Sequence, residues 1–116
     1  MIIQGRDTIE NQKEKNSHGG VGKYEVRTMY DSGFDSSMRY IREIILHAGS
    51  TIGPHLHEGD EEIYYFTSGE GEMIVDDEKQ QIKPGDTVLT KSGSRHGLNN
   101  TSDQELKFFV VCAKVA

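Results

Sequence analysis

Cysteine, proline and tryptophan are scarce in this 116-residue chain, which contains one cysteine, two prolines and no tryptophan. A single cysteine, Cys112, excludes both an intrachain disulfide and a thiolate metal cluster. Cys112 ends an apolar run with no cation directly beside it, so we expect a buried hydrophobic residue rather than a reactive thiol. This cysteine usage favours a cytoplasmic location.

Long hydrophobic runs are also missing. The longest, residues 44–46 and 108–113, fall far short of the roughly 20 residues that a membrane-spanning helix requires. The N-terminus lacks the basic region and the apolar core of a signal peptide. Acidic residues outnumber basic ones by 19 to 13, and the net charge of -6 disfavours a phosphate-backbone partner. We therefore expect one soluble domain with neither a membrane nor a nucleic-acid partner.

Turn-forming residues recur about every eight to twelve positions, a spacing that is typical of all-β domains. The runs between them are rich in Ile, Val, Tyr, Phe and Thr, and no window of ten or more residues shows the apolar stripe of an amphipathic helix. The expected strands are 24–30, 38–47, 62–67, 71–75, 80–82, 87–90, 96–99 and 106–112. Because short strands must protect their edges, we predict a barrel or a two-sheet jelly roll.

The first twenty residues differ in character from the rest of the chain. Residues 11–20 are wholly polar, a composition that is typical of a mobile arm or linker. We therefore divide the chain into a polar N-terminal arm, residues 1–20, and a single domain, residues 21–116. Two histidines have no neighbouring ligand pattern: His18 in the arm is expected to be solvated, and His47 to be exposed or to cap the backbone.

Three other histidines and one glutamate have the spacing of a metal site. His55 and His57 lie two residues apart, so in a strand their side chains point to the same face. Two inward imidazoles need a polar partner, which a metal ion supplies. Glu62 follows an acidic turn, and a hairpin at this turn would bring its carboxylate beside His55 and His57. His96 begins a later strand. Three imidazoles and one carboxylate would leave one or two positions of a divalent ion open.

Two further residues are candidates for contacts to a substrate. Strand alternation places Tyr64 on the same face as Glu62, so its hydroxyl could reach a bound oxyanion. Arg42 could bind a substrate carboxylate through two hydrogen bonds if its face of the preceding strand is the interior one. The neighbours of Glu62 are not expected at the site, because alternation turns Glu61 outward and Asp60 belongs to the turn.

Two separated motifs resemble those of the cupin superfamily. The first, Gly-x5-His-x-His-x4-Glu-x6-Gly, is matched at every position by Gly49, His55, His57, Glu62 and Gly69. The second, Gly-x5-Pro-x-Gly-x2-His-x3-Asn, is matched by Gly85, Gly93, His96 and Asn100, with Lys91 in place of the usual proline. The resemblance implies a conical β-barrel, or jelly roll, with a divalent metal ion held by the three histidines and the glutamate. With lysine instead of proline at position 91, the loop before His96 lacks one restriction on φ. Position 91 is not one of the ligand positions.

Alternative interpretations of the histidine pattern are disfavoured. His-x-His also occurs in hydrolases of the metallo-β-lactamase type, but there an Asp-His pair follows one residue later, where this chain has Gly59-Asp60. Some cupins have lost their metal and keep only the barrel. Here all four ligand types are retained at matching positions, so we expect bound metal.

The resemblance leaves two classes of function open. The first is a metalloenzyme of the dioxygenase, decarboxylase or isomerase type, in which Mn, Fe, Ni, Zn, Co or Cu acts as a Lewis acid or activates oxygen. Its catalytic candidates are Glu62 and Tyr64, and its substrate contacts are Tyr64 and Arg42. The second is a non-catalytic cupin that binds a small polar ligand for sensing or storage. Small cupins commonly dimerise, and a hydrophobic content of only 34% also favours a homodimer.

Overall fold

The computed structural model describes residues 1–115, in which ten strands form two antiparallel sheets. The strands are β1 (Gln12–Lys15), β2 (Lys23–Tyr30), β3 (Met38–Leu46), β4 (Thr51–Leu56), β5 (Asp60–Ser68), β6 (Gly71–Val75), β7 (Glu78–Ile82), β8 (Thr87–Thr90), β9 (Arg95–Asn99) and β10 (Leu106–Lys114). Two short 3-10 turns, η1 (Arg6–Thr8) and η2 (Ser17–Gly19), lie in the N-terminal segment. No helix in this described part of the chain is long and apolar enough to cross a membrane.

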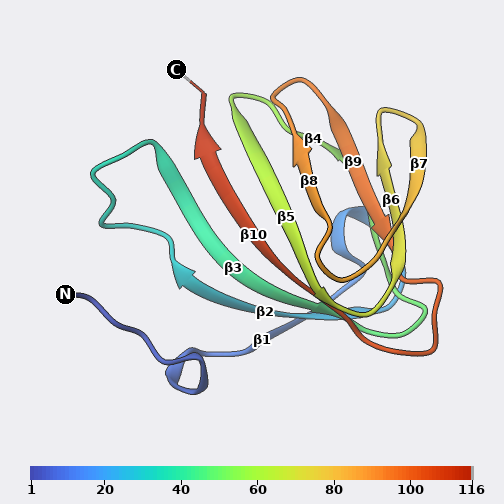
Figure 1. The fold of residues 1–116 in the computed structure, drawn as a ribbon, viewed down its shortest axis with the longest axis horizontal. Helices are drawn as coiled ribbons and strands as arrows, with labels where there is room; N and C mark the ends of the chain where they lie inside the picture. The colour runs from blue at the N-terminus through green and yellow to red at the C-terminus, as the bar shows by residue number, and fades with distance from the viewer. Residues whose placement is uncertain (116) are drawn as a thin grey trace.

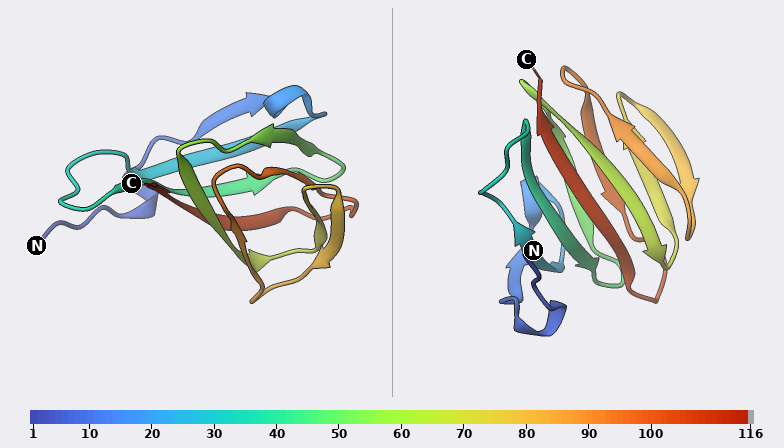
Figure 2. Two further views of the ribbon diagram at one scale, coloured as in Figure 1. Left: turned by 90° about the horizontal axis from the view of Figure 1, so that it is seen from above. Right: turned by 60° about the vertical axis from the view of Figure 1, so that its left-hand side comes forward.

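The two sheets face each other across the core. The six-stranded sheet has the order β1-β2-β3-β10-β5-β8, and the four-stranded sheet has the order β4-β9-β6-β7 (Figure 1). Strands distant in sequence are neighbours, since β10 pairs with both β3 and β5 (Figure 2). The all-β prediction is confirmed. Over residues 1–115 the strand pairing gives two facing sheets, which is the jelly-roll form of the expected fold.

Alternation of side chains along the strands builds the core between the sheets. Every second residue of β10 from Leu106 to Cys112 is buried. In β5 the side chains of Glu62, Tyr64 and Phe66 are buried, while those between them are exposed, as the sequence predicts. Burial of such apolar side chains supplies most of the folding free energy of a domain. The same alternation places polar groups such as Glu62 inside, where they need partners.

All eight predicted strands are present, with boundaries within two residues of those expected. Two further strands were not predicted. β4 contains Gly53 and Pro54, residue types that count against a strand interior. β1 is an edge strand whose four residues are all polar and exposed, so its sequence carries no alternation of apolar and polar residues.

The polar N-terminal segment is attached to the domain by hydrogen bonds. β1 pairs with β2, with Gln12 opposite Val26. Beyond the η2 turn, the Val21 N–H donates to Thr51 Oγ1 and the Thr51 N–H donates to Val21 O, both at 2.8 Å. The expectation of a mobile linker is therefore corrected for residues 12–20, because backbone pairing at a sheet edge does not require apolar side chains. The division of the chain at residue 20 stays a prediction.

Candidate metal centre

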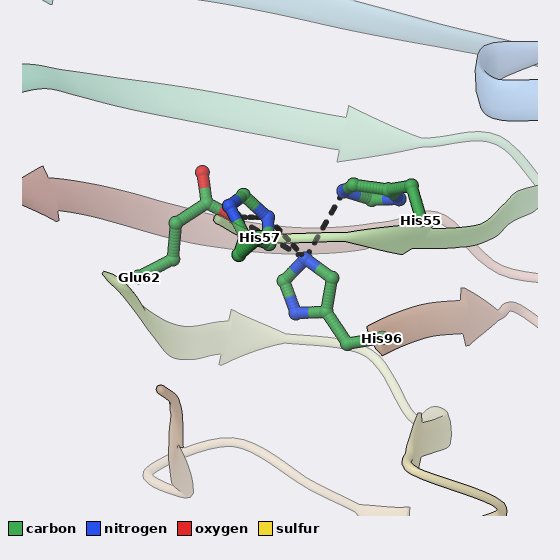
Figure 3. Close-up of side chains that lie close together, drawn as sticks. All are labelled: His55, His57, Glu62 and His96. Atoms are coloured by element: carbon green, nitrogen blue, oxygen red, sulfur yellow. Dashed lines mark hydrogen bonds and ion pairs between the residues drawn. The ribbon is translucent and has the colours of Figure 1, made fainter. Parts of the chain in front are cut away.

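Four side chains converge between the two sheets: His55, His57, Glu62 and His96 (Figure 3). One ligand atom from each lies within 4.8 Å of all the others. His96 Nε2 is 2.9 Å from His57 Nε2 and 3.1 Å from His55 Nε2. The carboxylate oxygen Glu62 Oε1 is 2.8 Å from His57 Nε2 and 3.2 Å from His96 Nε2. The four residues predicted as ligands from their spacing therefore form one cluster.

Strand pairing and one loop bring these ligands together. β4 and β9 pair so that His55 lies directly opposite His96. His57 follows the last residue of β4, and its backbone is fixed by the loop before β9, since its N–H donates to Ser94 O at 3.0 Å and its carbonyl accepts from Gly93 N at 2.6 Å. The chain then turns back at Gly59, which has a φ of +77°, so that β5 directs Glu62 inward.

All three imidazoles use Nδ1 for a hydrogen bond and direct Nε2 toward the common centre. The partners of Nδ1 are Gly53 O for His55 (2.9 Å), Asp60 Oδ1 for His57 (2.9 Å) and Thr90 Oγ1 for His96 (2.8 Å). A carbonyl or a carboxylate oxygen can only accept, so the first two rings carry their proton on Nδ1. This is the tautomer in which the Nε2 lone pair is free to bind a metal.

The carboxylate of Glu62 is buried and held by two kinds of partner. Its Oε1 atom faces the imidazoles, while Oε2 accepts a hydrogen bond from the hydroxyl of Tyr40. Burial acts to raise the pKa of Glu62, but hydrogen bonds with His96 and Tyr40 outweigh it and hold the pKa below its ordinary value. Burial and the bond to Glu62 raise the pKa of Tyr40, which keeps this donor protonated. Glu62 is therefore an ionised carboxylate with one oxygen directed at the centre.

The donor set fits a divalent cation. Adjacent ligand atoms of an octahedral ion with bonds of about 2.1 Å lie about 3.0 Å apart, close to the four separations given above. Three imidazole lone pairs and a carboxylate oxygen that face one another also repel, and a cation in the middle stabilises them. Nitrogen and carboxylate ligands suit Mn, Fe, Co, Ni, Cu or Zn. Four protein ligands would leave two positions of such an octahedral ion for other molecules.

A cavity of about 510 Å³ adjoins the ligands and is lined by β2, β3 and the N-terminal segment. Arg42 lies in its wall, because Arg42 pairs with Val110, whose side chain is buried in the core. The Arg42 guanidinium stacks 3.7 Å above the ring of Tyr40. Its Nε atom is buried without a hydrogen-bond partner among the described residues. A buried, unpartnered N–H beside a cavity is a site where an anion can bind.

Tyr64 lies deeper in the same cavity wall. It is 5% exposed, and its ring lies 5.0 Å from that of His96 and 4.7 Å from that of Phe108. Burial raises the pKa of Tyr64, so its phenol stays protonated. It shares the inward face of β5 with Glu62, as alternation predicts. A contact from its hydroxyl to a bound substrate stays a prediction.

One residue at the site was assigned wrongly from the sequence, and a contact of another was missed. Asp60 was expected in a turn, but it begins β5, is 7% exposed, and links His57 to Arg39, whose Nη1 lies 2.6 Å from Asp60 Oδ2. His18 is exposed, as expected, but its ring also stacks on that of His55 with centroids 3.7 Å apart. Neither the end of a turn nor a contact across 37 residues can be read from local composition.

His47 is neither a metal ligand of this centre nor a backbone cap. Its Nε2 atom lies 2.7 Å from Glu25 Oε2, so it pairs with a side chain on the neighbouring strand β2. Strand pairing explains this contact, because His47 directly follows β3, which runs antiparallel to β2. Cys112 is buried as predicted, and burial raises the pKa of its thiol to about 11, which keeps it unreactive.

Substitution of Asp60 by alanine is expected to weaken divalent-metal binding by about 10- to 100-fold, because His57 would lose the acceptor that fixes its ring and tautomer. Isothermal titration with Mn²⁺ measures the change. Glu61→Ala is the matched control, since Glu61 precedes Glu62 on β5 and lies on the opposite face. Equal weakening in both variants would contradict the role assigned to Asp60.

The stability of the metal-free protein is expected to fall as the pH drops from about 6.5 toward 4. Burial lowers the pKa of His55 to about 4, and burial also lowers the pKa of His18. Unfolded histidines titrate near 6.5, so below that pH the unfolded chain binds protons that the folded chain does not. Thermal unfolding from pH 7.5 to 5 measures this, with His55→Asn expected to show a shallower decline. An unfolding temperature that is constant over this range would contradict it.

Comparison with known proteins identifies the family of this chain. The family model described as the cupin domain matches residues 42–112, which include all four ligands. An oxalate-binding protein of Thermotoga maritima is 32% identical over 112 residues, which are 96% of this chain and 92% of that protein. The chain therefore belongs to the cupin family.

Solved structures agree with this assignment. The crystal structure of a protein from Thermotoga maritima, described as a predicted oxalate decarboxylase, superposes with a TM-score of 0.92 at 31% identity, over 99% of this chain and 100% of that one. The cupin domain of Cnp3 from Schizosaccharomyces pombe has a TM-score of 0.79 at 10% identity, over 98% of this chain and 74% of that one, and so shares the fold.

Proposed function

We propose that this protein is a metal-dependent cupin that binds a small dicarboxylate of the oxalate type. The observation that carries the proposal is the cluster of four ligand atoms beside a cavity whose wall holds Arg42. Four protein ligands leave two positions of an octahedral ion, and a dicarboxylate that chelates through two oxygens fills both. The names of two similar proteins, which refer to oxalate, support this choice of ligand.

Arg42 would bind the anion from the wall of the cavity. Its guanidinium carries a permanent positive charge and presents a buried Nε–H that has no partner among the described residues. Stacking on Tyr40 holds the guanidinium plane in place, and Tyr40 in turn donates to Glu62. Charge-assisted hydrogen bonds to a carboxylate are about twice as strong as neutral ones. Arg42 therefore supplies recognition while the ligand cluster holds the ion.

We further propose that the bound dicarboxylate is decarboxylated. A divalent ion at the four ligands would act as a Lewis acid on a carboxylate, and a redox-active ion would add oxygen chemistry. Cleavage of the carbon–carbon bond of hydrogen oxalate releases CO₂, and a proton replaces it on the remaining carbon to give formate. Tyr64, Glu14, His18 and Glu58 also line the cavity and carry groups that could move this proton.

The alternative is a non-catalytic cupin that binds oxalate for sensing or storage. The name of the oxalate-binding relative supports it. The two functions are separated by incubating the Mn²⁺-loaded protein with oxalate and measuring formate and CO₂. Formation of formate supports the enzyme, whereas tight binding with oxalate recovered unchanged supports the binding protein. Failure of the loaded protein to bind oxalate at all contradicts both.

Substitution of Arg42 by lysine is expected to weaken oxalate binding by about 10- to 100-fold and to leave metal affinity unchanged. Lysine keeps the positive charge but lacks the two parallel N–H donors of a guanidinium. Titration of oxalate into the Mn²⁺-loaded variant measures this. Arg27→Lys is the control, since Arg27 pairs with Glu43 across the outer face of the sheet. Unchanged oxalate affinity in Arg42→Lys would rule out the proposed contact.

A homodimer in the cytoplasm is also part of the proposal. The outward side chains of Ile63 and Leu89 are neighbours on β5 and β8, and they are 44% and 51% exposed. Burial of such side chains against a second copy would remove apolar surface from water.

A further inference from the structure

The η2 turn of the N-terminal segment is fitted tightly against β4. A Cβ atom on Gly53 would lie 2.0 Å from His18 O, and a Cβ atom on Gly20 would lie 2.3 Å from Thr51 O. Only glycine permits approaches this close. Asn16 and His18 both have left-handed φ values, 53° and 50°, which non-glycine residues adopt at a cost. The turn therefore has a specific conformation that is held against β4.

This fit places the imidazole of His18 face to face with that of His55. The two ring centroids are 3.7 Å apart and the ring planes differ by 12°. The rings of His57 and His96 meet that of His55 edgewise, with centroids 5.1 and 4.6 Å away. Gly53 O accepts from His55 Nδ1 at 2.9 Å. The His55 ring is thus held by the His18 stack on one face and by contacts along its edge.

His55 depends on this stack more than the other two histidine ligands do. His57 is 9% exposed and His96 is fully buried, whereas His55 is only partly buried and lies at the cavity. His57 also has a carboxylate partner, Asp60, while His55 has a backbone carbonyl, which restrains the ring less. His18, itself exposed, stacks on one face of this partly buried ring.

The parallel arrangement also excludes His18 as a further ligand in this conformation. Imidazole lone pairs lie in the ring plane, so an ion bound by His55 lies in the His55 plane. The ring of His18 is stacked 3.7 Å away and nearly parallel, so its own lone pair points past such an ion. His18 is also not among the residues whose ligand atoms converge at the centre.

We propose that His18 is a positioning residue, which fixes the ring plane of the metal ligand His55 by stacking on it. The inference rests on the proposed metal site and deepens it, because it assigns part of the metal geometry to the polar segment that precedes the domain. The flat surface of the His18 ring, rather than hydrogen bonding or ligation by its nitrogen atoms, would provide this contact. An aromatic side chain without nitrogen should therefore replace His18, and a small side chain should not.

The test uses Co²⁺, whose visible absorption spectrum reports the arrangement of its ligands. His18→Ala is expected to bind Co²⁺ about 3- to 10-fold more weakly than the unmodified protein and with a shifted spectrum, the size expected for loss of one aromatic stack. His18→Phe is expected to restore both the affinity to within about 2-fold and the spectrum. Glu61→Ala, whose side chain lies on the opposite face of β5 from Glu62, should leave both unchanged.

The outcomes separate failure of this inference from failure of the metal site. If the unmodified protein does not bind Co²⁺, the metal site is wrong. If the protein binds one Co²⁺ and His18→Ala matches it in affinity and spectrum, the site stands and the role of His18 is wrong. Equal losses in the alanine and phenylalanine variants would also overturn the stacking role, because they would point to the imidazole nitrogens.

Discussion

Replacement of His57 by alanine is expected to abolish one-to-one metal binding and to lower the affinity by more than 100-fold. The estimate is a lower bound, because loss of an outer partner of a ligand already costs about 10- to 100-fold. His57 contributes one of the four converging ligand atoms, and its Nε2 lies within 2.9 Å of both Glu62 Oε1 and His96 Nε2. Without it, the remaining three donors enclose the ion on fewer sides.

Elemental analysis of protein equilibrated with Mn²⁺ and then freed of excess metal measures this loss. Glu61→Ala serves as the control, because its side chain lies on the opposite face of β5 from Glu62. Circular dichroism establishes that both variants are folded before their metal contents are compared. A His57→Ala protein that retains one tightly bound ion would show that His57 is not a ligand.

Replacement of Phe108 by alanine is expected to lower the free energy of unfolding by about 3–5 kcal/mol. Phe108 is fully buried in β10, the strand that joins β3 to β5. Its ring packs 4.7 Å from that of Tyr64 and 5.3 Å from that of Phe66. Alanine would leave a cavity in the middle of the core, next to the tyrosine that lies between Phe108 and His96.

Urea unfolding monitored by circular dichroism measures the change. Tyr65→Ala is the control, since Tyr65 lies on the neighbouring strand β5, points outward and is 47% exposed. We expect the control to cost less than about 1 kcal/mol. A loss in Phe108→Ala as small as that in the control would mean that the core is not centred where the two sheets meet.

Most of the fold was predictable because its signals are local. Turn residues at regular intervals predict eight of the ten strands, and alternation within β5 and β10 predicts which of their side chains share a face. The clustering of the four candidate ligands was predictable for a different reason. A metal centre of the cupin type would need side chains at fixed separations along the chain, so the spacing from His55 to Glu62 and the later position of His96 carry the information.

The contacts around the ligands were not predictable, because they depend on strand register and on packing across the molecule. Alternation places Arg42 on one face of β3 but does not say which face is inward; pairing with the buried Val110 decides it. Tyr40, on that same face, reaches Glu62 from another strand. His18 reaches His55 only because two glycines allow a polar turn to approach β4 closely.

The central claim is that four side chains bind one cation. An anomalous difference map from crystals grown with Mn²⁺ tests it most directly. We predict one peak per chain between the two sheets, about 2.1 Å from the Nε2 atoms of the three histidines and from one oxygen of Glu62. A map without a peak at this position, or with manganese only on surface carboxylates, would contradict the account.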